Sequence, residues 1–397
     1  MRLRLTMRYW TIITILMILL AFALACISQG DNVQTPSLTP SMTQNATSSV
    51  HTSTSAMEMT LTSSRAGWVE NSTQTPSSPR LSDTASPLGG SSVNLQNGTS
   101  TLSPAGGLNS TENSESLSLS SVRSWACWLQ NASPEVIAES GFDLVVMDYS
   151  RDGSDETAYT REGIEGIKRA GIIPIAYISI GEAEDYRFYW NESWKENPPA
   201  WLGPENPDWE GNYAVRYWDE EWKEIVFRYL DRIIAQGFMG VYLDKVDEYW
   251  FWAESYNESW TAERMIELIL EIANYTRSKA GRDFIIIPQN GEYLLEYDNG
   301  TLLATVSGWA SEDVFYNGLE PSPWTAEKVP PLKKVVNAGK PVFVVDYVDD
   351  GTGSEENLAR ILDFIDKARR AGFIPYATFE DRELDRLDVI PGIQPPK

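Results

Sequence analysis

The chain has 397 residues, and its 56 Asp and Glu against 32 Lys and Arg give a formal net charge of −24. Residues 121–397 alone hold 27 basic and 50 acidic residues, a net charge of −23, which makes this part a poor nucleic-acid binder. The only histidine is His51, in a Ser- and Thr-rich segment, which excludes Ser-His-Asp and Cys-His catalysis and zinc held by histidines.

Residues 1–26 have the layout of a signal peptide. Three arginines among the first eight residues precede an apolar run that ends at residue 25 and is short for a membrane span. The stretch Ala-Leu-Ala-Cys at 23–26 resembles a lipobox with the usual Leu-Ala order inverted, so Cys26 is the predicted lipid anchor. The alternative is a signal anchor retained over residues 9–25. Both interpretations predict an extracellular protein that is held at the cell surface by its N-terminus.

Residues 27–120 consist mainly of Ser, Thr, Pro, Asn and Gly and show almost no apolar periodicity. Such a segment buries too little surface to offset its ordering entropy, so we expect a disordered stalk. Nine Asn-x-Ser/Thr sequons along the whole chain favour an exported glycoprotein. Apart from Cys26 only Cys127 remains, so no intramolecular disulfide and no thiolate metal cluster is expected.

From residue 121 onward one pattern repeats: a helix, a small residue, a glycine, an apolar strand and a polar ending. Six stretches show it, at residues 139–149, 169–179, 235–244, 279–290, 337–347 and 370–379. Each glycine suits the left-handed position that follows a helix. The strands are nearly continuous apolar runs, which is typical of parallel strands covered by helices.

Two further strands, at residues 122–129 and 308–316, bring the count to eight over about 275 residues, the usual size of a (β/α)₈ TIM barrel. The alternative is an open doubly wound sheet, but no glycine-rich phosphate loop follows the first strand. The predicted domain is therefore a (β/α)₈ barrel at residues 121–397.

Polar residues end most of these strands, and in a barrel the carboxyl ends of the strands meet on one face. They are Asp148, Glu182, Asp244, Asp247, Asn290, Glu292, Glu312, Asp313 and Asp346. Carboxylates can act as an acid and a nucleophile or base, as in glycoside hydrolysis; they can hold Mg²⁺ or Ca²⁺; or they can recognise a polycation.

Aromatic residues favour a saccharide ligand. Thirteen of the fifteen tryptophans follow residue 120, and six lie between Trp190 and Trp222, in an insertion too irregular and proline-rich for a helix. Trp250, Trp252 and Trp260 follow on the same face. We expect about two in five of all these rings to face solvent and bind sugar units, and the others to pack the insertion.

The stretches YISIGEAEDYRFYW, GVYLDKVDEY, PQNGE and SEDVFYNG resemble, in order and spacing, the bacterial and archaeal branch of glycoside hydrolase family 114. This is the endo-α-1,4-polygalactosaminidase family of (β/α)₈ barrels, and the resemblance covers about residues 123–390. In its fungal branch the catalytic Asp lies in an Asp-Asn-Val-Asp motif and its Glu partner in an Asn-Glu-x-Cys-Phe motif.

The resemblance implies that Asp244 is the nucleophile and Glu312 the general acid and base of a retaining cleavage. Lys245 and Ser311 stand where those motifs have Asn, and Val314 stands where they have Cys, so the substrate can differ. The implied substrate is an amino-sugar polysaccharide, cationic when partly de-acetylated, and no cofactor or metal is implied.

Further residues around the two acids are expected to bind the sugar: Asp148, Tyr149, Tyr177, Glu182, Asp247, Asn290, Tyr316 and Asp346. For Asp247 the alternative is an ion pair with Lys245 or Arg187. The alternative functions are a catalytically inactive saccharide-binding surface protein on the same barrel and a divalent-metal hydrolase that uses Asp244, Asp247 and Glu312.

Overall fold

Eight parallel strands form the centre of the fold. The computed structural model describes residues 117–256 and 260–396. The strands are β1 (Trp125–Trp128), β2 (Leu144–Met147), β3 (Ile173–Ser179), β7 (Gly240–Asp244), β8 (Ile285–Pro288), β9 (Trp309–Glu312), β12 (Val342–Asp349) and β13 (Ile374–Phe379). They pair in parallel in the orders β1-β2-β3-β7-β8 and β13-β12-β9.

Hydrogen bonds join the two sheets where their edge strands meet, between β8 and β9 and between β1 and β13. Between β8 and β9, Gln289 and Ala310 form a parallel bridge, and the Ser307 N–H donates to the Ile286 carbonyl at 2.8 Å. Between β1 and β13, the Trp125 indole donates to the Ile374 carbonyl at 2.9 Å. The eight strands therefore follow one another in chain order, which is consistent with a (β/α)₈ barrel.

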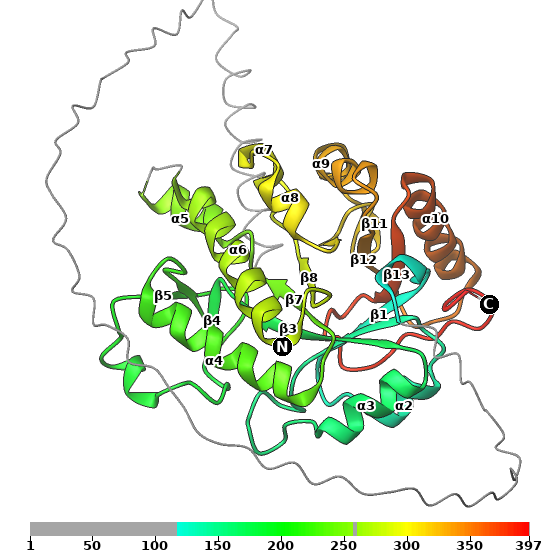
Figure 1. Ribbon diagram of the computed structural model, residues 1–397. Coiled ribbons are helices and arrows are strands. Elements are labelled where there is room, and N and C mark those ends of the chain that lie inside the picture. The colour runs from blue at the N-terminus through cyan, green and yellow to red at the C-terminus, as the bar shows by residue number, and fades with distance from the viewer. Residues whose placement is uncertain (1–116, 257–259, 397) are drawn as a thin grey trace, which may run out of the picture. The chain divides into compact units, whose positions relative to one another are not determined.

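The helices lie outside these strands (Figure 1). They are α2 (Pro134–Glu139), α3 (Arg161–Arg169), α4 (Glu220–Gln236), α5 (Glu248–Tyr256), α6 (Trp260–Ala280), α7 (Leu294–Tyr297), α8 (Thr301–Thr305), α9 (Thr325–Asn337) and α10 (Glu355–Ala371). In α4, the Asp219 side chain caps the first turn, Ile225, Tyr229 and Ile233 are buried, and Gly237 ends the helix with φ 91°. This sequence pattern, repeated along the chain, makes the helix–glycine–strand units.

The insertion after β3 contains a small antiparallel sheet that its irregular sequence does not suggest. Its strands are β4 (Glu182–Glu184), β5 (Leu202–Glu205) and β6 (Asn212–Val215), in the order β4-β6-β5. Strands this short, interrupted by prolines, leave little periodicity in the sequence. The short elements η1 (Leu119–Ser121), η2 (Glu192–Lys195), β10 (Tyr316–Asn317) and β11 (Glu320–Pro321) complete the structure.

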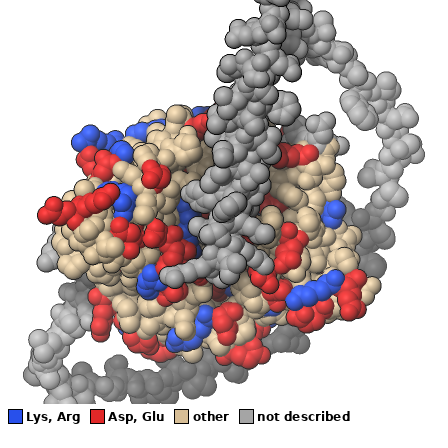
Figure 2. All heavy atoms as spheres, turned by 180° about the vertical axis from the view of Figure 1, so that it is seen from behind, with Lys and Arg blue, Asp and Glu red and all other residues tan. Residues whose placement is uncertain are grey.

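The predicted signal peptide, the lipid anchor Cys26 and the stalk up to residue 116 lie outside the described residues. The last part of the expected stalk differs from the prediction, because Leu117 and Leu119 pack against the core of the barrel. Among the described residues, no helix is both long and apolar enough to cross a membrane. Acidic side chains are spread over the face shown in Figure 2, with fewer basic ones between them.

Candidate active site

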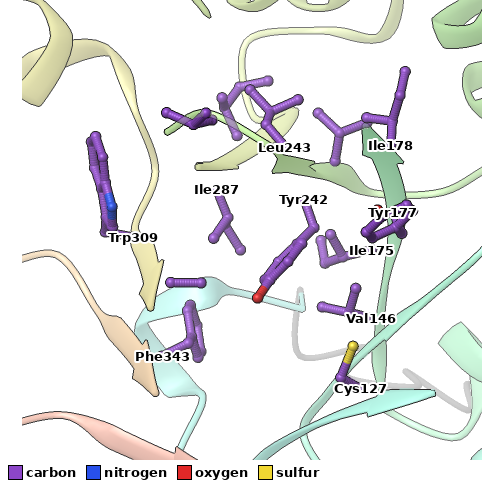
Figure 3. Packing of buried hydrophobic residues seen from close by; sticks show 14 of the residues in the cluster. Cys127, Val146, Ile175, Tyr177, Ile178, Tyr242, Leu243, Ile287, Trp309 and Phe343 are labelled. Atoms are coloured by element: carbon purple, nitrogen blue, oxygen red, sulfur yellow. The ribbon is translucent and has the colours of Figure 1, made fainter. Parts of the chain in front are cut away.

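Large buried side chains form a floor beneath the carboxyl ends of the strands. Figure 3 shows Tyr242 between Ile287 and Ile175, with Cys127 and Phe343 close by. The Trp125 and Tyr242 rings stack with centroids 6.3 Å apart. This floor excludes water, so charged groups directly above it are poorly solvated.

Asp244 is the last residue of β7 and is held at both carboxylate oxygens. The Tyr177 hydroxyl, from the neighbouring β3, donates to Oδ2 at 2.6 Å, and the Lys245 backbone N–H donates to Oδ1 at 2.8 Å. Burial raises the pKa of Asp244 to about 7, against the opposing effects of the Lys245 charge and the Tyr177 hydrogen bond; the Glu312 charge raises it further. Asp244 is thus a positioned carboxylate that titrates near neutral pH.

Glu312 is the last residue of β9 and is held in a similar way. The Tyr347 hydroxyl of β12 donates to its Oε2 at 2.9 Å, and the Asn290 amide donates to its Oε1 at 3.2 Å. The Glu312 backbone N–H in turn donates to the Asn290 Oδ1 at 3.2 Å. Asn290 has φ 56°, a left-handed conformation that Asn tolerates better than most residues. Asn290 and Tyr347 therefore fix the Glu312 side chain above the end of β9.

The charges of the two carboxylates act on one another and on the floor. Glu312 raises the pKa of Asp244, and both acids raise the pKa of the buried Cys127 thiol, for which burial is the largest cause. Burial, and after it the Cys127, Glu312 and Asp244 charges, also raises the pKa of Tyr242. Asp244 and Glu312 therefore belong to one electrostatic site over this floor.

Lys245 and Glu182 form an ion pair beside Asp244. The Lys245 Nζ lies 2.8 Å from the Glu182 Oε1, and Glu182 is buried. Asn206 and Asn212, from the insertion sheet, donate to the two Glu182 oxygens at 2.7 and 3.4 Å. The insertion thus fixes Glu182, and Glu182 fixes the lysine that follows Asp244.

Asp148 is buried beneath this region in a second ion-pair cluster. Its Oδ2 lies 2.6 Å from Arg187 Nη1, and Arg187 Nε lies 2.6 Å from Glu184 Oε2. The Arg187 guanidinium also lies over the Tyr177 ring, 5.8 Å from its centroid. Arg187 therefore pairs with Asp148 and Glu184 rather than with Asp247, and it supports the tyrosine that binds Asp244.

Three further residues that were predicted to bind sugar have partners other than the two acids. Asp346 is fully buried and accepts the backbone N–H groups of 314, 315 and 316 at 2.8 to 2.9 Å. The Tyr149 hydroxyl donates to the Gly153 carbonyl at 2.8 Å, and the Tyr316 hydroxyl donates to Asp363 at 2.6 Å. These contacts hold loops and a helix in place, so they give the three side chains a structural role and lend no support to the expectation that they bind a sugar.

Asp247 and Glu292 are two further carboxylates near the pair. Burial raises the pKa of both; the Lys245 charge opposes the shift at Asp247, and the Lys328 charge opposes it at Glu292. The Lys328 ammonium donates to the Glu312 backbone carbonyl at 2.8 Å, so it is a cation of the same site. Within the described chain, no side chain donates a hydrogen bond to Asp247 or Glu292.

Tyr347 and Lys328 are site residues that the sequence reasoning missed. Successive side chains of a strand point to opposite faces, so Tyr347 faces Glu312 because its neighbour Asp346 points away. The alternation of side chains along β12 is the sequence signal that predicts Tyr347 on the face of Glu312. Lys328 lies on α9, and no strand-end pattern predicts it.

The exposure of the tryptophan rings shows which of them face solvent and which pack inside the domain. Trp201, Trp222 and Trp252 are buried, whereas Trp209 and Trp250 are about half exposed. Trp201 packs edge-on against Trp194 with centroids 5.0 Å apart. Most rings of the insertion therefore pack against one another.

The described residues include no group of three or more His, Cys, Asp or Glu side chains placed to hold a metal ion. The geometry of Asp244, Asp247 and Glu312 thus lends no support to the metal-hydrolase alternative. What the site does provide is two carboxylates, each held by a tyrosine hydroxyl, at the ends of two strands. This arrangement can supply a nucleophile and a proton donor to one bond.

Comparison with known proteins agrees with this chemistry. A model of glycoside-hydrolase family GH114 matches residues 108–394. An uncharacterized protein of Methanocaldococcus jannaschii is 59% identical over 268 residues, covering 66% of this chain and 78% of that protein. An uncharacterized protein of Thermotoga maritima is 51% identical over 277 residues, covering 69% and 85%. The glycoside hydrolase domain of PelA from Pseudomonas aeruginosa shares the fold, with a TM-score of 0.53, 18% identity and coverage of 68% and 98%.

Proposed function

Because the chain belongs to glycoside-hydrolase family GH114 and is a glycoside hydrolase, we propose that its substrate is a polysaccharide that contains amino sugars. Asp244 is the nucleophile, and Glu312 is the general acid and base of a retaining reaction. The observation that carries this proposal is the placement of the two carboxylates at the ends of β7 and β9, each with a tyrosine hydroxyl as donor.

The proposed reaction has two steps. The ionised Asp244 attacks the anomeric carbon while Glu312 gives its proton to the glycosidic oxygen, and the glycosidic bond breaks. Glu312 then takes a proton from water, and the oxygen of that water displaces Asp244 from the anomeric carbon. The Tyr177 hydrogen bond favours the ionised form of Asp244 that the first step needs.

The charge of the site supports a cationic substrate. Asp247 and Glu292 lie near Glu312, and, among the described residues, no side chain donates a hydrogen bond to them. The ammonium group of a de-acetylated hexosamine pairs with the partly exposed Asp247 and the buried Glu292, whereas an acetamide group does not neutralise them. The resemblance to the polygalactosaminidases supports the same substrate class.

A reducing-end assay on a panel of polymers tests the proposal. We expect the wild-type chain to release reducing ends from a partly de-N-acetylated α-1,4-galactosamine polymer, and much less from the fully acetylated polymer. Equal cleavage of both forms contradicts the electrostatic argument. Binding without cleavage of any polymer supports the inactive saccharide-binding alternative, and loss of cleavage in a chelator supports the metal hydrolase.

We propose further that the enzyme acts outside the cell and is tethered to the membrane through its N-terminus. The basic start, the short apolar run and Cys26 support this location. Cell fractionation of the wild type and of Cys26→Ser tests it. We expect the substitution to release the chain from the membrane fraction, and retention of the variant there contradicts a lipid on Cys26.

A further inference from the structure

Two aromatic rings lie side by side at the rim of the proposed active site. We call Trp250 and Tyr293 the rim pair; their ring centroids are 5.6 Å apart and their planes are inclined by 39°. Trp250 is 48% exposed, and Tyr293 is partly exposed. Trp250 belongs to α5, directly after β7, and Tyr293 precedes α7, directly after β8. The rim pair is therefore on the face that carries Asp244 and Glu312.

The loops that carry the rim pair are in contact and are continuous with the site. The backbone N–H of Trp250 donates to the Asp247 backbone carbonyl at 3.0 Å, and Tyr293 directly follows Glu292 in the chain. A Cβ atom added to Gly291 would lie 3.1 Å from the Asp247 backbone nitrogen, so the two loops touch. The charges of Asp247, Glu292 and Glu312 act on one another. The two loops that carry Asp247 and Glu292 thus also carry the rim pair.

Other exposed tryptophans lack these features. Trp209 lies in the turn between β5 and β6, and Trp324 precedes α9; in the described part of the chain neither packs against another ring. Trp252, two residues after Trp250, is buried and donates its indole N–H to the Val215 carbonyl at 2.8 Å. The rim pair therefore combines exposure, a neighbouring ring and continuity with the carboxylates.

We propose that the rim pair is a binding subsite for sugar units of the substrate chain beyond those that contact Asp244 and Glu312. Sugar rings present flat C–H faces that pack against aromatic planes. Asp247 and Glu292 bind polar groups of the intervening unit. This inference rests on the proposed function and adds that the enzyme acts on long chains in preference to short ones.

The test compares a long and a short substrate in the full-length chain. The probes are a partly de-N-acetylated α-1,4-galactosamine polymer and its disaccharide. Trp250→Ala removes the exposed ring, Trp250→Phe keeps an aromatic plane, and Phe251→Ala is the matched control, since Phe251 is 39% exposed on the same helix. We expect Trp250→Ala to lower kcat/KM on the polymer by about three- to tenfold, with the disaccharide unchanged. Trp250→Phe restores most of this loss, and Phe251→Ala has no effect.

Two outcomes overturn the inference while leaving the proposed function intact: an unchanged kcat/KM on the polymer, or an equal loss on both substrates. If the wild type cleaves neither substrate, the proposed function fails, and calorimetric binding of the polymer and disaccharide then tests the rim pair separately. Weaker binding of the polymer alone by Trp250→Ala supports the subsite. Equal binding by both proteins, or no binding by the wild type, overturns it.

Discussion

Two tyrosine hydroxyls, from Tyr177 and Tyr347, each hold one of the proposed catalytic carboxylates. Their donor distances to Asp244 and Glu312 are 2.6 and 2.9 Å. Hydrogen bonds from a hydroxyl to an ionised group are stronger than those between neutral groups. The orientation of the acids therefore depends on residues that carry no charge at neutral pH.

Tyr347→Phe tests this dependence at Glu312. Glu312 carries a proton at the start of the reaction, and loss of a hydrogen bond between neutral groups costs about 0.5 to 1.5 kcal/mol, so we expect kcat/KM to fall by about two- to tenfold. The melting temperature should change little, because the ring remains in place. Steady-state kinetics and thermal unfolding of the variant are compared with those of Tyr297→Phe, whose side chain is 54% exposed. An unchanged kcat/KM contradicts the positioning role of Tyr347.

The pH dependence of the rate tests the environment of Asp244. Burial, which is the largest cause, raises its pKa to about 7, so the ionised nucleophile is lost as the pH falls through 7. We expect kcat/KM to decline below about pH 7. In Tyr177→Phe the carboxylate loses a donor that favours its ionised form, so the acidic limb should move to higher pH. A pH–rate profile with the same acidic limb in both proteins contradicts this account.

At the scale of the elements, the direction of each side chain on β12 separates a structural acid from a site residue. Asp346 accepts three backbone N–H groups of the segment that follows β9, and the next residue, Tyr347, contacts Glu312. Burial raises the pKa of Asp346 to about 7. This buried carboxyl is thus part of the loop structure directly after the proposed acid.

Asp346→Asn tests that structural role. The amide keeps one acceptor oxygen, so at least one of the backbone N–H groups loses its partner. We expect the free energy of unfolding to fall by about 1 to 3 kcal/mol, measured by urea denaturation. Asp283→Asn is the control, because Asp283 is exposed. Equal stability of the two variants contradicts the role given to Asp346.

Elements were easier to predict than the directions of side chains. The eight strands and their polar ends follow from apolar runs and glycines, which are local properties of the sequence. The partners of Asp148, Tyr149 and Tyr316 come from segments up to 47 residues away and cannot be predicted from a strand-end pattern. The sheet of the insertion was missed because its strands contain only three or four residues each.

At the scale of the whole molecule, a buried pair of carboxyl groups links the C-terminal segment to the barrel. The buried Asp388 carboxyl lies close to the buried Asp349, at the end of β12, and Asn357 donates to Asp349 at 2.6 Å. Burial first, and then the Asp349 charge, raises the pKa of Asp388 to about 8. The folded protein thus holds a proton at Asp388 that the unfolded chain releases near pH 4.

This proton predicts how stability changes with pH. Between about pH 4 and 8 the folded state binds more protons at Asp388 than the unfolded state does. The contribution of Asp388 to the free energy of unfolding therefore falls as the pH rises. Asp388→Asn places an uncharged amide beside Asp349 and removes the group that titrates. We expect the variant to gain stability relative to wild type between pH 5 and 9, by at least about 1.4 kcal/mol, the equivalent of one pKa unit. If the difference in unfolding free energy between the variant and the wild type does not depend on pH, Asp388 does not hold a proton in the folded state.

The central claim is that Asp244 and Glu312 together cleave an amino-sugar polymer. The most direct test measures reducing ends released from a partly de-N-acetylated α-1,4-galactosamine polymer by the full-length wild type, Asp244→Asn and Glu312→Gln. Calorimetric binding is measured in parallel. The account predicts a loss of activity of about a hundredfold or more in both variants, with polymer binding retained. Cleavage at the wild-type rate by either variant would contradict it.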